Sequence, residues 1–99
     1  MELILDKRVE VVVDNLTDIE QGRVLGYLDL FREKKFGLPQ RYLKKIDRNL
    51  WELRPGNIRL LLGKVGSIIV VVNLFKKKSQ KTPKNEIKTA RNRLKEYEL

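Results

Sequence analysis

The clearest pattern along the chain is helical and begins at residue 17. Thr17, followed three positions later by Glu20, forms a capping box in which each side chain bonds the other residue's backbone N–H. Apolar residues then recur at helical spacing and predict an amphipathic helix (Val24, Tyr27, Leu28 and Phe31). Gly37 suits the position just past the end of such a helix, and Pro39 prevents its continuation.

Patterns in the second half of the chain predict a three-stranded meander. Residues 50–54 and 58–63 alternate between apolar and polar side chains, and the Arg-Pro-Gly-Asn turn at 54–57 joins them. Residues 68–74 are dominated by β-branched side chains, which indicates a buried strand. We expect a second hairpin over residues 63–66, with Gly63 paired to Gly66.

Two regions of the chain are ambiguous. Residues 3–5 fit a short first strand, but residues 8–15 combine a strand propensity with the possibility of a short helix. Residues 40–49 are polar and basic, and we expect them to form a connection with at most a helical turn at 41–46. A single α+β domain over residues 1–99 follows from this order of elements.

A final helix is expected at residues 83–97. Thr82 fits the N-cap and Pro83 the first helical position, where the missing N–H costs nothing. One face carries an apolar stripe (Ile87, Ala90, Leu94 and Tyr97). A second stripe is basic (Lys84, Lys88, Arg91 and Lys95).

Composition removes several classes of function. The chain has neither cysteine nor histidine, which excludes disulfides, thiolate zinc sites and histidine-based triads. We expect no metal and no cofactor. No apolar stretch has the roughly 18 residues of a membrane span, and the N-terminus lacks the features of a signal peptide. The cytoplasm is the expected compartment, without a membrane partner.

The charge is high and unevenly distributed. The formal net charge is +9, and residues 75–99 hold nine basic side chains against three acidic ones, a net of +6. A basic C-terminal quarter indicates a polyanionic partner, with nucleic acid as the first candidate. A merely solvated surface is the alternative.

The first hairpin offers a candidate phosphate clamp. If its turn covers residues 55–58, Arg54 and Arg59 lie opposite each other, an arrangement that an anion between them would stabilise. Both arginines can instead be solvated, or Arg54 can pair with Glu52. With Gly63 paired to Gly66, the same sheet face continues to Lys76. Trp51 lies on the opposite face and is expected in the core.

The lysine-rich segment after the last strand supplies further cations (Lys76, Lys77, Lys78 and Lys81). RNA can be cleaved without a metal by attack of its own 2′-hydroxyl group. This reaction needs a phosphate held in line with the attacking oxygen and cations that stabilise the charge on the phosphate oxygens. It also needs a proton acceptor and a proton donor, and lysine can serve as either. Tyr97 extends an apolar stripe, so its expected role is packing, with a hydroxyl that can also reach a substrate.

At this point the sequence resembles the HigB-like toxins of the RelE superfamily. The resemblance is carried by residues 50–54 (LWELR), 58–60 (IRL) and 73–83 (NLFKKKSQKTP), followed by Glu86 and residues 90–97. It implies a microbial-RNase-type fold with N-terminal helices on one side of a small sheet, a C-terminal helix, and mRNA on the other side. Residues 8–15 would then be a short helix.

The resemblance also implies a function and a set of site residues. The implied function is that of a ribosome-dependent mRNA endonuclease that a helix-turn-helix antitoxin neutralises. The protein would contact operator DNA only indirectly, through this antitoxin. Arg54 and Arg59 would bind the scissile phosphate, and one of the loop lysines would help proton transfer. Tyr97 matches a C-terminal aromatic of the family. The full expected set is Arg54, Arg59, Lys77, Lys78 and Tyr97 for catalysis, and Lys76, Lys81, Lys84, Lys88 and Arg91 for RNA contact.

Two other functions stay open from the sequence. The same fold can serve as a non-catalytic module that binds RNA or DNA through its basic face. It can also be an interaction protein whose basic surface holds an acidic partner. Relatives often carry a histidine near the site, and this chain has none, so the proton acceptor is left unassigned.

Overall fold

The computed structural model describes residues 1–98, and a five-stranded sheet lies at its centre. The elements in chain order are β1 (Glu2–Leu5), α1 (Lys7–Asp14), α2 (Asp18–Lys34), the short 3₁₀ helix η1 (Lys35–Gly37), β2 (Leu43–Asp47), β3 (Leu50–Leu53), β4 (Ile58–Val65), β5 (Ile68–Lys76) and α3 (Lys84–Lys95). The strand order is β1-β5-β4-β3-β2, with β1 parallel to β5 and all other pairs antiparallel. The predicted α+β class is confirmed, and the arrangement is consistent with a RelE-like fold.

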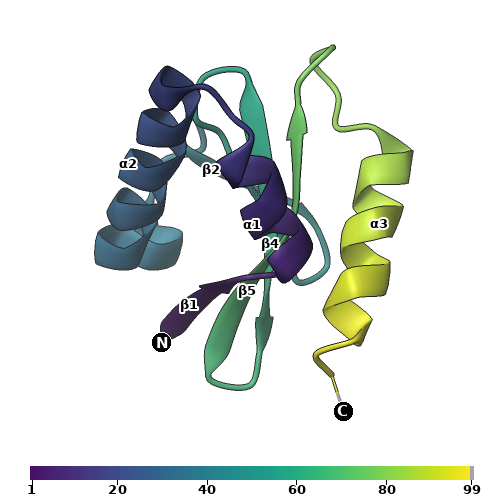
Figure 1. Cartoon of the computed structure of the whole chain (residues 1–99). Helices are drawn as coiled ribbons and strands as arrows, with labels where there is room; N and C mark the ends of the chain where they lie inside the picture. The colour runs from purple at the N-terminus through teal and green to yellow at the C-terminus, as the bar shows by residue number, and fades with distance from the viewer. Residues whose placement is uncertain (99) are drawn as a thin grey trace.

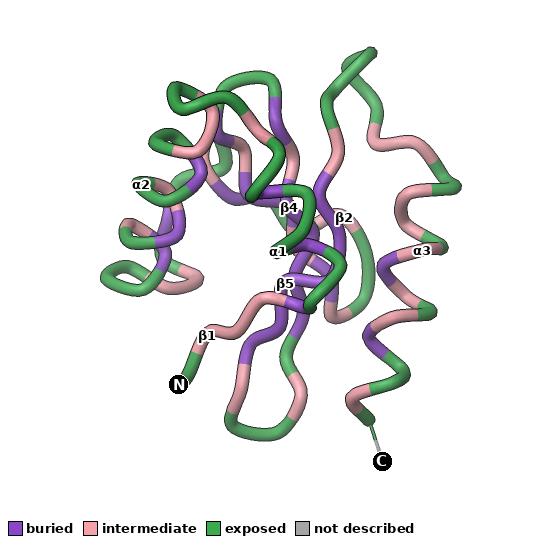
Figure 2. The backbone as a smooth tube through the Cα atoms, in the orientation of Figure 1, coloured by how far each residue is buried: buried purple, intermediate pink, exposed green. Residues whose placement is uncertain are grey.

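Helices cover both faces of the sheet (Figure 1). α1 and α2 pack on one face through a core that includes Phe31, Leu60 and Leu62, whereas α3 packs on the other through Ala90 and Leu94. Because both faces are covered, consecutive residues of β4 and β5 are buried, as Figure 2 shows. The N-terminal helices thus lie on one side of the sheet, as the resemblance implies, and the C-terminal helix α3 covers part of the second face.

The N-terminal helices follow their local sequence signals. The capping box is present, with the Glu20 N–H donating to Thr17 Oγ1 at 3.2 Å and the Thr17 N–H to Glu20 Oε1 at 3.0 Å. Residues 7–14 are helical as the resemblance implies, because Val9 and Val13, four positions apart, are buried together against the sheet.

The end of α2 differs from the prediction. Lys35, not Gly37, takes a positive φ, of 52°, two positions earlier than predicted. The next residue, Phe36, packs between Phe31 and Trp51, with ring centroids 5.3 and 4.6 Å apart, and this contact holds the end of the helix. Trp51 accordingly lies at the core on the α2 side, as predicted.

The expected connection at residues 40–49 contains a strand, so the predicted helical turn at 41–46 is wrong. Leu43 is buried and pairs with Leu53, and Lys44 lies opposite Glu52. β2 is the outermost strand of the sheet, and lysines are common on such edges because they oppose edge-to-edge association. Its sequence therefore resembles a polar loop.

The second hairpin has a different register from the predicted one, and β5 also contains a bulge. The turn lies at Gly66, with φ of +59°, and Gly63 pairs with Val70 rather than with Gly66. Leu61 pairs with Asn73 but Leu62 with Val71, so Val72 is an extra residue in β5.

The bulge also changes the face on which the end of β5 projects. Arg59 now lies opposite Phe75, and Lys76 projects to the α2 side, where its Nζ pairs with Glu20 Oε2 at 3.1 Å. The expectation that Lys76 shares the face of Arg59 is therefore wrong. α3 completes the bulge, because Arg93 Nη1 donates to the freed Val72 carbonyl at 3.0 Å.

α3 docks closely on the sheet. Ala90 and Leu94 of the predicted apolar stripe are buried, and Ile87 and Tyr97 pack beside them. Gly63 permits this approach, since a Cβ there would lie 2.7 Å from the Asn49 carbonyl oxygen and from Leu94 Cδ2. The N-cap is Pro83 rather than Thr82, whose hydroxyl is used elsewhere.

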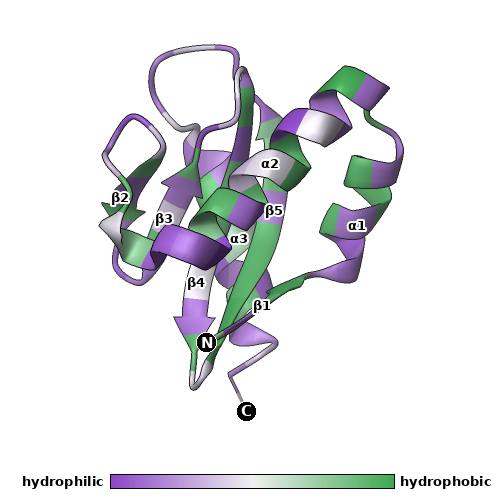
Figure 3. Cartoon of the chain, turned by 90° about the vertical axis from the view of Figure 1, so that its left-hand side faces the viewer, coloured by the Kyte–Doolittle hydropathy of each residue, from purple (hydrophilic) through white to green (hydrophobic). Residues whose placement is uncertain are grey.

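Figure 3 shows largely apolar strands behind helices in which hydrophilic and hydrophobic residues are mixed, and several apolar residues of α1 and α2 are exposed (Val11, Val12, Ile19 and Leu25). None of the helices in the described part of the chain has the length and apolar character needed to cross a membrane.

Both ends of the chain meet at Asp6, which is 3% exposed. Its carboxylate accepts hydrogen bonds from Arg8 Nε at 2.8 Å and from the Tyr97 hydroxyl at 2.7 Å. The Arg8 hydrogen bonds hold the pKa of Asp6 well below its ordinary 3.8, although burial opposes them. Burial and the bond to Asp6 raise the pKa of Tyr97 to about 12.

We predict that Asp6→Asn lowers the free energy of unfolding by about 2 kcal/mol at pH 7, because it weakens charge-assisted hydrogen bonds. The folded-state pKa of Asp6 is depressed, so its stabilisation is present above pH 3.8 and is lost as the pH falls below it. Urea unfolding should show a smaller difference between the two proteins at pH 3 than at pH 7. The exposed control Glu2→Gln should change little at either pH, and a constant difference for Asp6→Asn would contradict the assignment.

Candidate functional site

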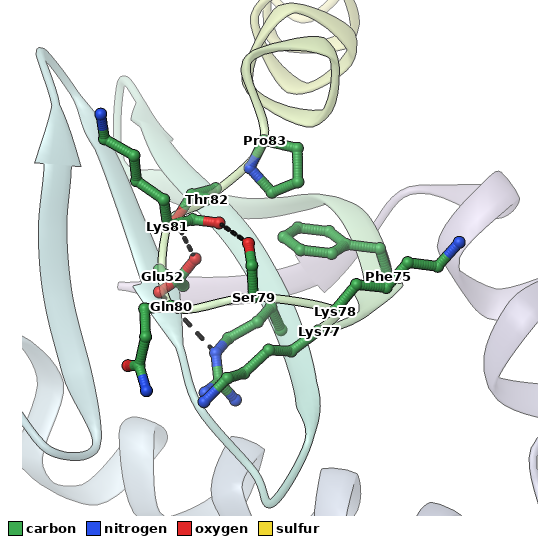
Figure 4. Close-up of a pocket in the computed structure, with 10 residues that line it drawn as sticks. Glu52, Phe75, Lys77, Lys78, Ser79, Gln80, Lys81, Thr82 and Pro83 are labelled. Carbon is green, nitrogen blue, oxygen red and sulfur yellow. Dashed lines mark hydrogen bonds and ion pairs between the residues drawn. The ribbon is translucent and has the colours of Figure 1, made fainter.

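A basic pocket lies where β3 and β4 meet the segment that follows β5. Glu52 and Arg59 contribute from the two strands, and residues 77–83 pass over them; we call these residues the lysine loop (Figure 4). The pocket is lined by Glu52, Arg59, Phe75, Lys77, Lys78, Ser79, Gln80, Lys81, Thr82 and Pro83.

The strand register explains how the two arginines come together. Leu53 pairs with Leu60 and Glu52 with Leu61, and the same register places Arg54 opposite Arg59 at the mouth of the hairpin. Their side chains are 25% and 12% exposed. Burial lowers the pKa of Arg59, and the Glu52 carboxylate opposes this effect. The predicted opposition of the two arginines is present.

The anion between the arginines belongs to the protein itself. The Glu52 side chain is 2% exposed, and its Oε1 lies 3.0 Å from Arg54 Nε and 3.8 Å from Arg59 Nε. The pairing of Arg54 with Glu52, which the sequence left open, is what the structure shows. Arg59 Nη1 also donates to the carbonyls of Gly56 and Ile58, each at 2.8 Å.

Glu52 also holds the lysine loop. The Thr82 hydroxyl donates to Glu52 Oε2 at 2.5 Å, at the far end of the loop. At the near end, the Lys77 N–H donates to the Asn57 carbonyl at 2.7 Å, and between them Ser79 Oγ donates to the Lys81 carbonyl at 3.1 Å. The loop is thereby fixed over the two arginines, while the Lys81 side chain points away from Glu52 (Figure 4).

The structure brings together some of the predicted site residues. Arg59, Lys77, Lys78 and Lys81 line the pocket, and Arg54 lies beside it through Glu52. Arg54 also lines an adjoining groove with Lys81 and Lys84.

Other predicted site residues lie apart from the pocket. Lys76 is paired with Glu20 on the opposite face of the sheet, and Lys88 is exposed on α3. Arg91 Nη2 pairs with Asp47 Oδ2 at 2.9 Å. Tyr97 follows the C-terminal end of α3 and donates to Asp6, whereas the pocket adjoins the N-terminal end of that helix. Twelve helical residues, about 18 Å, separate these two ends.

Polar residues of this region that were not among the predicted site residues include Lys44, Glu52 and Thr82. Glu52 precedes Arg54 by two positions, and this spacing puts both side chains on one face of a strand. This spacing of two was the sequence feature that could have identified Glu52 as a site residue. The sequence offered none for Thr82, whose helix-cap pattern indicated a different hydroxyl partner.

The arrangement is suited to binding an anion and stabilising charge on it. Guanidinium groups bind phosphate oxygens through paired N–H donors, and the loop lysines add positive charge at the rim. Both Glu52 oxygens accept hydrogen bonds, so this carboxylate positions its neighbours.

We predict that Glu52→Gln makes the protein responsive to anions. The substitution keeps the side-chain shape but leaves two guanidinium groups facing each other without a negative charge, which should cost about 3 kcal/mol. Phosphate or sulfate should then raise the melting temperature of the variant more than that of the wild type, compared with sodium chloride at equal ionic strength. The exposed control Glu33→Gln should respond as the wild type does. Equal shifts in all three proteins would argue against an anion site between the arginines.

Comparison with known proteins places this chain in a family. No curated protein matches it. The family model described as "Phage derived protein Gp49-like (DUF891)" matches residues 12–95, and this family is associated with toxins of toxin–antitoxin systems. The match includes β2 to β5, the lysine loop and α3. Since it spans most of the 99 residues, the chain belongs to the Gp49-like family of phage-derived proteins.

Proposed function

We propose that this protein is the toxin of a type II toxin–antitoxin system and that it cleaves translated mRNA on the ribosome. The observation that carries the proposal is the pocket lined by Arg59 and three loop lysines, Lys77, Lys78 and Lys81, with Arg54 beside it through Glu52. Membership of a toxin-associated family supports the toxin assignment. The cleavage reaction and the ribosome are our proposal.

The proposed chemistry needs no metal. The 2′-oxygen of a nucleotide attacks the adjacent phosphorus, the bond from phosphorus to the 5′-oxygen breaks, and the products carry a 2′,3′-cyclic phosphate and a 5′-hydroxyl. One proton leaves the attacking hydroxyl, and one reaches the departing oxygen. Arg54 and Arg59 hold the phosphate and stabilise the charge on its oxygens, and a lysine of the loop carries a proton.

In this proposal the ribosome aligns the reacting atoms of the mRNA, which compensates for the weak proton carriers of the pocket. The chain contains no histidine, and Glu52 is hydrogen-bonded to Arg54 and Thr82, so we assign proton transfer in the pocket to lysines. A weak proton carrier suffices when the reacting atoms are already aligned, because positioning alone can contribute several kcal/mol, roughly 7–11 in favourable cases. Messenger RNA held in a decoding site has its backbone fixed in this way.

An antitoxin is the proposed protein partner. The family association supports such a partner, and we propose a helix-turn-helix antitoxin that alone contacts operator DNA. Neutralisation is achieved if that protein covers the lysine loop or holds it away from the arginines.

A non-catalytic RNA-binding module is the second candidate. It is favoured by one observation, namely that both oxygens of the carboxylate in the pocket are already hydrogen-bonded. Such a protein would bind RNA through the same basic residues and leave it intact.

We predict that expression of the wild-type chain in a bacterial host produces new mRNA 5′ ends inside translated codons, and that Arg54→Ala with Arg59→Ala abolishes them. Loss of one donor to a developing oxyanion typically costs about 10²–10³ in rate, so the double variant should show no signal. Sequencing of 5′ ends gives the measurement, with Arg32→Ala on α2 as a control that stays active. Intact messages in the presence of folded wild-type protein would exclude the nuclease and leave the binding module.

A further inference from the structure

A basic groove adjoins the pocket between β2 and α3. It has a volume of about 350 Å³, within the range of small-ligand sites, and is lined chiefly by Lys44, Ile46, Arg54, Lys81, Lys84 and Ile87. Thr82 and Lys81 line both the groove and the pocket, so the two adjoin each other.

Five basic residues line this groove: Lys44, Lys45, Arg54, Lys81 and Lys84. Lys44 lies opposite Glu52 in the β2–β3 register and so shares the face of the pocket, whereas the Nζ of the next residue, Lys45, lies 5.3 Å from the Trp51 ring centre on the other face. Arg54 pairs with Glu52, but among residues 1–98 no ion pair involves Lys44, Lys81 or Lys84. No acidic side chain lines the groove. Three cations are therefore available to a ligand.

The floor of the groove is apolar. Ile46 and Ile87 are partly buried and belong to the packing layer between the sheet and α3. A ligand that fits has negative charge along one edge and flat apolar groups along the other. Nucleotides combine these properties, since their phosphates suit lysines and their bases and riboses suit an apolar floor.

We propose that this groove binds the nucleotide next to the scissile phosphate in single-stranded RNA. Lys44 and Lys84 contact the neighbouring phosphate, and the ribose or base lies over Ile46 and Ile87. The inference rests on the proposed function, because the phosphate between Arg54 and Arg59 defines where the strand starts. Arg54 lines the groove and also pairs with the pocket carboxylate, so a strand leaving the pocket on this side enters the groove directly.

An acidic peptide is less well suited to the groove. A peptide offers carboxylates at variable spacing and gains nothing from an adjoining phosphate pocket, whereas an RNA strand places a phosphate at every nucleotide. The position of the groove next to the pocket, with Lys81 and Thr82 lining both, is therefore the observation that favours RNA.

Binding of an uncleavable RNA tests the groove separately from catalysis. The probe is a fluorescein-labelled hexanucleotide in which every ribose is 2′-O-methylated, so that no hydroxyl is available for attack. Fluorescence anisotropy between 50 and 200 mM salt, roughly the range over which phosphate contacts weaken strongly, should show weaker binding for Lys44→Ala. Its slope of log affinity against log salt should be smaller by about 0.7, the value for one phosphate contact on a single strand.

Matched variants make the result specific. Lys34→Ala removes the same charge from exposed α2 on the opposite face and should bind as the wild type does. Lys44→Arg should restore affinity and slope. Equal RNA affinities and salt slopes for Lys44→Ala and Lys34→Ala, or no saturable binding of the RNA by the wild type, would overturn the proposal that the groove binds RNA. The proposal would also be overturned if a hexaglutamate peptide bound as tightly as the RNA and lost as much affinity when Lys44 is replaced by alanine.

The two proposals fail in different ways. A wild-type protein that binds the modified RNA through Lys44 but leaves translated messages intact supports the groove and excludes the nuclease. A wild-type protein that cleaves messages but shows no effect of Lys44→Ala on RNA binding supports the nuclease and excludes the groove.

Discussion

The structure of the basic pocket depends on a single buried carboxylate. Glu52 neutralises two arginines from adjacent strands and anchors a loop that starts 25 residues later, at Lys77. A buried charge of this kind adds little net stability, because its desolvation offsets its attractions. Its effect is on geometry, since every partner must occupy one place for the charge to be satisfied. The protein thus holds an arginine pair ready for a phosphate without the repulsion that the pair would otherwise suffer.

The bulge at Val72 sets which lysines reach this pocket. Without the extra residue, Lys76 would project beside Arg59; with it, Lys76 pairs with Glu20 in the first turn of α2, and the loop that starts at Lys77 passes over Glu52. A run of three lysines in the sequence is therefore divided between two faces of one sheet. Lys76 thus contacts the α2 layer, whereas Lys77 and Lys78 line the pocket.

The sequence predicted those parts of the fold whose signals are local. The capping box at Thr17, the apolar face of α2 and the opposition of Arg54 and Arg59 depend on residues a few positions apart, and all three are present. β2 was missed because an edge strand with two lysines has the composition of a loop. The bulge was missed because Arg93, which satisfies its carbonyl, lies 21 residues away from Val72. Thr82 was assigned to a helix cap because nothing near it in the sequence indicates the competing acceptor, Glu52.

The parallel pairing of β1 with β5 has a consequence for how the protein is made. Glu2 pairs with Ile68, so the sheet closes across 66 positions of the chain, and contacts of such long range form slowly. The pocket also needs β3, β4 and the lysine loop together, and α3 must dock to complete the bulge. A nascent chain in which the lysine loop and α3 have not yet been exposed has no assembled pocket. Chain growth itself thus delays the appearance of the basic site until these residues have been made.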